Sequence, residues 1–235
     1  MGERLTVGDL DVRVEIVPSR RTVRLTVERD ATVTAQVPAP IDPDVLTKVI
    51  RDRSQWLYGK LAAREADADA RPRKEFVNGE GFRYLGRNHR LELTDDSAHD
   101  VRLVHGRLLL LRTARPTEAL VAWYRRAGQR WLPPRAAAWA RTMGLEPPRI
   151  AVRPLGYRWG SCGTGGTLNF HWAVMQLPAD LVDHVIVHEL VHLVHRGHTP
   201  AFWRTVELAQ PGAEHRRKLL RDAGASLWLP ADPPW

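Results

Sequence analysis

The feature that most constrains this chain is a cluster of histidines in one short apolar segment. Five of its ten histidines lie between His184 and His198, and His188, Glu189 and His192 form the pattern H-E-x-x-H. Two histidines four residues apart fall about 40° apart around a helix axis and about 6 Å apart along it, so both imidazoles can reach one zinc ion. The glutamate is offset by about 100°, which places it beside the metal as a general base for water. The segment therefore predicts a zinc-dependent hydrolase.

A three-histidine zinc site needs a third ligand from chain that has left this helix. His184 and His195 are expected on the same helical face as the pair, but a triplet that includes either would span roughly 10 Å, too far for bonds of ~2 Å. Gly197 and Pro200 predict a helix end and a new helix start around His198. We therefore expect His198 as the third ligand, whereas His184 and His195 become candidates for supporting a ligand or contacting the substrate.

Three ordered motifs extend the pattern: R-W-G-S-C at 158–162, L-N-F-H-W at 168–172, and H-E-L-V-H-L-V-H-R-G-H-T-P-A-F-W at 188–203. Together they resemble the YgjP-like metallopeptidase family, which is related to the SprT and WLM groups of zinc proteases. The resemblance is strongest over about residues 116–222. It implies a zincin-like domain whose active-site helix packs on a small sheet, a polypeptide substrate, and zinc binding and acid–base catalysis by His188, His192, His198 and Glu189.

The N-terminal third has a different pattern. Apolar and polar residues alternate over 4–37, which predicts half-buried antiparallel strands. A helix is expected over 42–64, and the hydrophilic stretch 65–74 is expected to be a linker. We therefore predict a β-rich region with one helix over 1–74 and the metallopeptidase-like domain over 75–235.

In the second region strands lead and helices follow, so the chain is expected to be α+β. A long helix is expected over 117–142, where the pair Pro133 and Pro134 should kink or restart it. Short helices are predicted at 200–208 and 213–223. Strands are predicted at 75–77, 81–85, 89–93, 101–104, 107–111, 150–154 and 167–174.

The strand expected over 167–174 is the predicted edge of the catalytic sheet. An extended peptide could add to such an edge and present its carbonyl to the metal. Asn169, which would lie on one face of that strand with His171, is therefore a candidate for substrate binding.

Catalysis also needs a donor for the developing oxyanion. Arg158, His195 and Tyr157 are the candidates, and the sequence leaves the choice among them open. Arg158 could equally bind a substrate carboxylate or phosphate, or form a structural ion pair. The family resemblance places Cys162 in a structural turn beside the zinc helix, so it is expected to be a small buried side chain rather than a nucleophile. A zinc-ligand role is not expected, because three histidines leave only the position that catalysis must keep open.

Composition adds expectations about partners and compartment. The net charge of +8 favours nonspecific attraction of nucleic acid at low salt. No apolar run reaches the ~20 residues of a membrane span, the first residues do not resemble a signal peptide, and a single cysteine suits the cytoplasm. Two alternatives to a peptidase remain: a metal-dependent nucleotide pyrophosphohydrolase, and a DNA-associated protein that retains a zinc site. The first lacks a phosphate-binding glycine loop ahead of a helix, and the second would not need Glu189.

Overall fold

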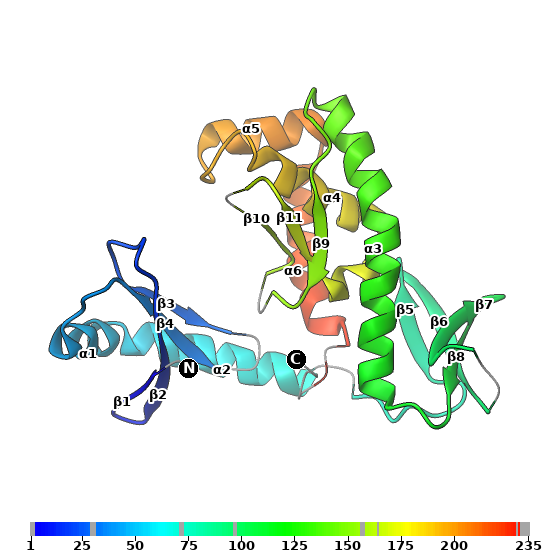
Figure 1. Cartoon of the computed structure of the whole chain (residues 1–235), viewed down its shortest axis with the longest axis horizontal. Helices are drawn as coiled ribbons and strands as arrows, with labels where there is room; N and C mark the ends of the chain where they lie inside the picture. Colours follow the sequence, from blue (N-terminus) through cyan, green and yellow to red (C-terminus); the bar gives the residue numbers. More distant parts are fainter. Residues whose placement is uncertain are drawn as a thin grey trace. The chain divides into compact units, whose positions relative to one another are not determined.

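The structure is a computed structural model that describes residues 3–28, 32–70, 73–95, 98–155, 158–163, 165–228 and 230. The chain consists of two compact units, Met1–Ala70 and Arg71–Trp235, and each has its own apolar core. Both units contain helices and a small mixed sheet (Figure 1). The described residues therefore form a mixed α and β protein.

The first unit is built on a four-stranded sheet with the order β1-β2-β4-β3. Buried and exposed side chains alternate along most of β2, as the sequence pattern predicts. β2 and β4 pair in parallel, so the expectation of purely antiparallel strands is wrong. The reason is that the chain first forms β3 and then returns to place β4 between β2 and β3. β4 is antiparallel to β3 and therefore runs in the same direction as β2. The strands are β1 (Glu3–Val7), β2 (Leu10–Ile16), β3 (Arg24–Val27) and β4 (Val33–Val37).

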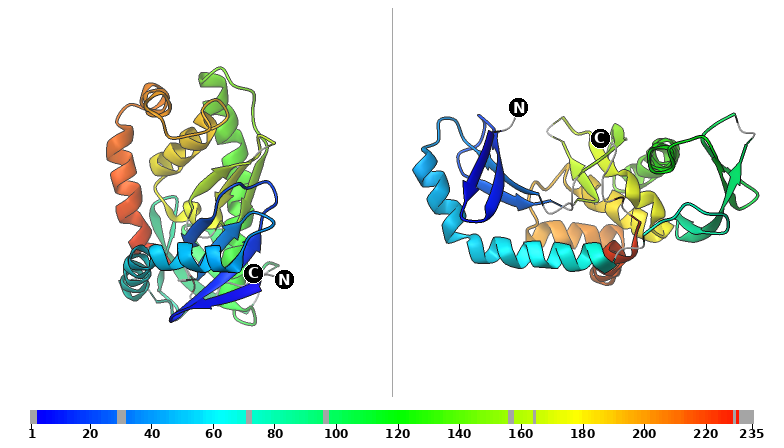
Figure 2. Two further views of the ribbon diagram at one scale, coloured as in Figure 1. Left: turned by 90° about the vertical axis from the view of Figure 1, so that its left-hand side faces the viewer. Right: turned by 90° about the horizontal axis from the view of Figure 1, so that it is seen from below.

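Two helices, α1 (Pro43–Asp52) and α2 (Ser54–Ala70), follow this sheet and contact it (Figure 2). The single helix expected here is interrupted at Arg53, where the chain makes a turn. α2 continues into the stretch 65–74 that was expected to be a linker. Residues 65–70 contain neither glycine nor proline, so nothing in the sequence breaks the helix there.

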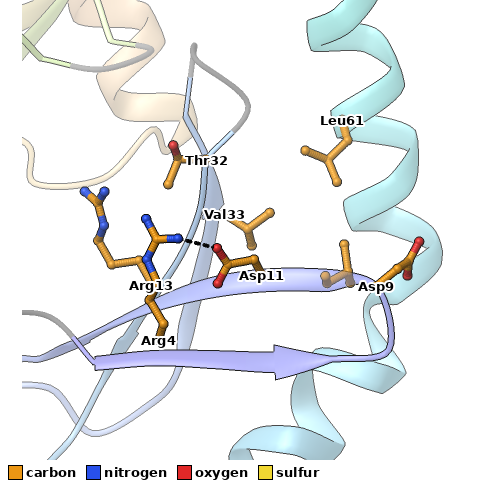
Figure 3. Close-up of a pocket in the computed structure, with 8 residues that line it drawn as sticks. Arg4, Asp9, Asp11, Arg13, Thr32, Val33 and Leu61 are labelled. Atoms are coloured by element: carbon orange, nitrogen blue, oxygen red, sulfur yellow. Dashed lines mark hydrogen bonds and ion pairs between the residues drawn. The ribbon is translucent and has the colours of Figure 1, made fainter.

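The first unit also has a surface pocket of about 290 Å³ (Figure 3). Arg4 donates to Asp11 across 2.6 Å, and the Tyr58 hydroxyl donates to the carboxylate of Asp9. Charged groups around the pocket are thus partly neutralised by each other. Among the described residues, the pocket lining contains no histidine or cysteine, so it lacks the ligand types of the H-E-x-x-H motif. The lining residues are Arg4, Asp9, Leu10, Asp11, Arg13, Thr32, Val33 and Leu61.

The second unit begins with a four-stranded sheet of order β5-β6-β8-β7, in which β6 and β8 are parallel. The strand expected over 75–77 does not form. The Phe76 N–H donates instead to the Glu80 carboxylate at 2.7 Å, so a side chain rather than a neighbouring strand satisfies it. The strands are β5 (Gly81–Tyr84), β6 (Arg87–Thr94), β7 (Val101–Val104) and β8 (Arg107–Leu111).

The longest helix, α3 (Pro116–Thr142), packs against the strand β9 (Ile150–Arg153) and against α4 (Ala179–Val191) (Figure 1). It continues through Pro133 and Pro134, so the helix does not restart at this pair. Neither α3 nor any other helix among the described residues is long and apolar enough to cross a membrane.

A three-stranded sheet of order β10-β11-β9 supports the histidine segment. β10 (Gly160–Cys162) pairs antiparallel with β11 (Leu168–His171), and β9 pairs parallel with the other side of β11. β11 is therefore the central strand, and the prediction that it is the sheet edge is wrong. All four of its residues are buried, and the chain turns into a 3₁₀ helix, η1 (Trp172–Gln176), directly after it.

α4, which carries H-E-x-x-H, lies at the centre of the second unit. It contacts α3, β10 and the two last helices, α5 (Pro200–Ala209) and α6 (Ala213–Ser226). Its side chains are buried on nearly every face. This explains why the segment is apolar all round rather than amphipathic.

An ion pair ties α4 to α3. Arg135 donates from Nε and Nη2 to the two carboxylate oxygens of Asp183, at 2.8 and 2.6 Å. The Asp183 side chain is only 7% exposed, whereas that of Arg135 is 48% exposed. Asp183 therefore depends on Arg135 for its neutralisation, but the guanidinium still reaches water.

Replacing Arg135 should destabilise the protein because it leaves a buried carboxylate without its partner. We expect Arg135→Ala to lower the free energy of unfolding by about 3 kcal/mol, measured by urea denaturation. The matched control is Arg125→Ala on the same helix, at an exposed position, which should change it by less than about 0.5 kcal/mol. Equal stability of the two variants would mean that this ion pair does not hold α4.

Candidate metal centre

The first two histidines of the candidate site lie at the end of α4. α4 ends at Val191 and His192 is its C-cap, so His188 and His192 occupy the last helical turn, with ring centroids 5.0 Å apart. The expectation that His195 shares their helical face is wrong. The chain leaves the helix after Val191, and the His195 N–H closes the terminal turn by donating to the Val191 carbonyl at 2.8 Å.

The third histidine is positioned by the start of α5. Thr199 caps this helix by accepting a hydrogen bond from the Phe202 N–H at 3.3 Å, and Pro200 occupies its first turn. His198 precedes the cap, and its Nε2 lies 3.0 Å from Nε2 of His188. The potential ligand atoms of the three histidines all lie within 4.8 Å of one another. The helix end and restart expected from the sequence thus bring His198 to the other two.

This spacing fits one metal ion. Bonds of ~2.0 Å in a tetrahedral site separate two ligand atoms by about 3.3 Å, close to the 3.0 Å between the His188 and His198 nitrogens. Nδ1 of His192 donates to the His195 carbonyl at 3.0 Å, which fixes the tautomer and leaves Nε2 for a metal. His198 is exposed, so the group remains accessible from solvent.

Aromatic side chains of α5 hold the three rings in place. The ring of Phe202, which is fully buried, lies 4.6–4.9 Å from all three imidazoles. Trp203 stacks on His198, with ring centroids 5.6 Å apart. The Arg217 guanidinium in turn lies over the Trp203 ring, 4.5 Å from its centroid. The sequence reasoning did not assign either aromatic a role, although both belong to the F-W pair that ends the third motif.

The electrostatics favour the neutral, metal-binding form of His188 and His198. Burial, followed by the nearby positive charge of His192 and His198, lowers the pKa of His188 to about 3. Burial also lowers the pKa of His198, with further contributions from His192 and Arg217. A lowered pKa leaves imidazole neutral, with a lone pair available for a metal.

Glu189 follows His188 on α4 and is buried, with 5% of its surface exposed. Burial raises the pKa of its carboxyl to about 8, while the positive charge of Arg158 and a hydrogen bond from the Cys162 backbone N–H oppose the rise. Its Oε2 is buried and has no hydrogen-bond partner among the described residues. A buried carboxylate oxygen of this kind is costly unless a group that binds in the site uses it.

The other candidate residues have different environments. Arg158 is exposed, and its charge acts on Glu189. His195 Nε2 lies 3.2 Å from the Thr205 hydroxyl, so this ring faces α5. His184 is buried and bonds through Nδ1 to the Gln210 amide oxygen at 3.0 Å. Neither of these two histidines belongs to the group of converging ligand atoms.

The remaining candidates divide between the sheet and the undescribed part of the chain. Asn169 is buried, and its Nδ2 donates within the β10–β11 hairpin, to the Ser161 carbonyl at 3.2 Å and the Thr167 carbonyl at 3.4 Å. Tyr157 lies outside the described residues. Cys162 is half-buried, and burial together with the charge of Glu189 raises the pKa of its thiol, which disfavours the nucleophilic thiolate.

Comparisons with known proteins identify the family of this chain. A family model described as YgjP-like, metallopeptidase domain, matches residues 21–223. Among solved structures, the crystal structure of the metallopeptidase zymogen of Pyrococcus abyssi abylysin is 24% identical, over 41% of this chain and 97% of that one, with a TM-score of 0.37. No curated protein matches. The resemblance expected from the motifs is confirmed by the family match, and the chain belongs to the YgjP-like metallopeptidase family.

Proposed function

We propose that the protein is a zinc-dependent metallopeptidase that hydrolyses peptide bonds, with a zincin-like arrangement of helix and sheet. The observation that carries the proposal is the convergence of three histidine nitrogens, together with a buried Glu189 on the same helix whose Oε2 has no hydrogen-bond partner among the described residues. Three imidazoles suit zinc better than magnesium, which prefers carboxylate oxygens. Membership in the metallopeptidase family supports the same reaction class.

Each residue has a distinct role in this mechanism. His188, His192 and His198 would hold the zinc ion. When bound, zinc supplies a Lewis acid that polarises the substrate carbonyl and lowers the pKa of water to about 7. Glu189 takes the proton from the attacking water and delivers it to the leaving amine. Its buried position keeps bulk water away from this transfer.

The oxyanion donor is proposed to be Arg158. Its positive charge acts on Glu189, so it lies close enough to the reaction centre to stabilise developing negative charge. His195 is a weaker candidate because its ring nitrogen already contacts Thr205. The amide of Asn169 is likewise used within its own hairpin.

A peptide substrate is proposed to add to β10 rather than to β11, which has neighbours on both sides. Two hydrogen bonds flank the pairing of β10 with β11. The His171 N–H donates to the Trp159 carbonyl, and the Gly163 N–H donates to the Thr167 carbonyl. In an antiparallel pair the residues between such hydrogen-bonded positions direct their main-chain groups outward. Gly160 and Cys162 therefore direct their main-chain groups toward the outer edge of the described sheet. Glu189 already accepts from the Cys162 N–H, so a peptide would pair with the main-chain groups of Gly160 and with the Cys162 carbonyl.

The distribution of charge favours a second, weaker interaction, which is nonspecific attraction of nucleic acid. Residues 71–235 carry 24 Lys and Arg against 15 Asp and Glu, whereas residues 1–70 carry 11 against 12. The excess positive charge thus belongs to the unit with the candidate site. Nonspecific binding of nucleic acid at low salt stays a prediction on this basis, as does a cytoplasmic location from the single cysteine.

An assay of three substrate classes side by side tests the proposed function. Full-length protein loaded with zinc should hydrolyse an unfolded polypeptide, lose this activity to a chelator, and regain it when zinc is added. Nucleoside triphosphates and DNA serve as the alternative substrates. Hydrolysis of triphosphates without hydrolysis of polypeptide would replace the peptidase by a pyrophosphohydrolase. DNA binding without any hydrolysis would favour a nonenzymatic DNA-associated protein.

A further inference from the structure

Strand β10 passes so close to Glu189 that a side chain at Gly160 would overlap it. A Cβ atom placed on Gly160 would lie 2.7 Å from Cγ, 2.7 Å from Oε1 and 2.9 Å from Cδ of Glu189. Carbon contacts of this length are far inside the usual 3.5–4.0 Å. The nearest atoms to the missing Cβ all belong to this one side chain. Gly160 is therefore a close-approach glycine whose neighbour is the proposed general base.

Strand β10 also contacts the Glu189 carboxylate through its main chain, at Cys162. Cys162 lies two residues further along β10, so its main chain faces the same edge as that of Gly160. Its N–H donates to the Glu189 carboxylate. The strand thus packs against the side chain at one residue and binds it at another. These two contacts fix the carboxylate between β10 and α4, while Oε2 keeps no partner among the described residues.

We propose that Gly160 is a positioning residue for Glu189: the absence of its side chain lets β10 approach closely enough for the Cys162 N–H to hold the carboxylate in the orientation that catalysis needs. This inference rests on the proposed function, in which Glu189 transfers the proton. It gives the W-G-S-C motif a physical role, although the motif contains none of the proposed metal ligands. It also distinguishes the positioning of the base from the binding of the metal.

The alternative is that Gly160 only allows the sheet to pack. The contacts separate the two roles because the atoms in the way belong to the Glu189 side chain, from Cγ outward, and not to backbone. In Gly160→Ala the strand can stay in place while the Glu189 carboxylate swings away from it. The fold and the histidines should then survive, and the base should be misplaced.

The first experiment compares Gly160→Ala with Gly165→Ala. Gly165 lies in the same β10–β11 hairpin, and a Cβ placed there would meet nothing within 4 Å. In peptide hydrolysis by the zinc-loaded protein, Gly160→Ala should lower kcat about 100-fold with little change in KM, the scale expected for a misplacement of about 1 Å. Its zinc content should equal that of the wild type. Gly165→Ala should match the wild type in kcat, KM and zinc content.

The second experiment needs no activity. Melting temperatures of the metal-free protein are measured for wild type, Gly160→Ala, Glu189→Ala and the double variant. Gly160→Ala should lower the melting temperature by about 5 °C when Glu189 is present, through crowding, and by much less when Glu189 is alanine. If Gly160→Ala does not fold at all, the double variant should still fold, because it lacks the atoms that collide.

The inference would be overturned by an unchanged kcat in Gly160→Ala, by loss of zinc together with activity in that variant, or by an equal loss of stability in both backgrounds. A double variant that fails to fold would do the same. Failure of the proposed function has a different signature, since the wild type would then hydrolyse no peptide, yet the stability cycle would still report the contact with Glu189.

Discussion

Glu189→Gln should keep its metal and its fold but lose peptide hydrolysis by roughly two to four orders of magnitude, the usual contribution of a positioned acid–base group. Glutamine has nearly the same size, and its amide oxygen can still accept the hydrogen bond from the Cys162 N–H that the carboxylate accepts. It cannot accept a proton near neutral pH. The loss should therefore appear in kcat, measured on a peptide substrate at saturating zinc.

The control for this variant is Glu146→Gln, which removes the same charge at an exposed position. It should be as active as the wild type. A Glu189→Gln protein with wild-type activity would remove the proposed mechanism for any substrate. Loss of zinc or of fold in Glu189→Gln would instead make Glu189 a structural residue and the motif a metal-stabilised helix end.

Metal content should separate the three ligands from the other two histidines of the segment. The purified protein should carry about one zinc per chain, and His188→Ala, His192→Ala or His198→Ala should each lose it, with activity falling to that of the chelated protein. His184→Ala and His195→Ala should retain the zinc, because their rings contact Gln210 and Thr205 instead. Elemental analysis after gel filtration gives the zinc-to-protein ratio.

His198→Ala is the most informative of these variants. If it kept its zinc, the third ligand would have to be sought among neighbouring carboxylates such as Glu207 and Glu214. Both already have partners: Glu207 accepts from the Gly212 and Ala213 N–H groups, and Glu214 pairs with Arg217 at 2.9 Å. Retention of zinc would therefore also require one of these contacts to break.

The sequence predicts that three histidines converge, because the signals for this convergence lie close together in the chain. The i, i+4 spacing defines His188 and His192, and the Gly197–Pro200 stretch marks where the chain turns to bring in His198. The same spacing also predicts that the helix continues to His195, which is wrong. Helix ends depend on which partners the last carbonyls find, and here the terminal turn closes early.

Strand positions were harder to predict than helix positions, because edge and centre are set by distant partners. The sequence predicts an edge strand over 167–174, yet β11 is buried on all its residues and paired on both sides. The true edge beside Glu189, β10, has only three residues, which begin with glycine and serine. Such a segment has little strand propensity, so only its packing against α4 reveals its role.

The contacts of α5 also determine how the free energy of metal binding is divided. In zinc fingers the ion orders the chain, so binding and folding are one event. Here Thr199 caps α5 and Phe202 is fully buried against an apolar cluster that includes Val187 and Val206. These contacts preorganise His198 and bear much of the entropy cost of bringing it to its partners. Zinc affinity should consequently depend on the packing beneath α5 as well as on the three imidazoles.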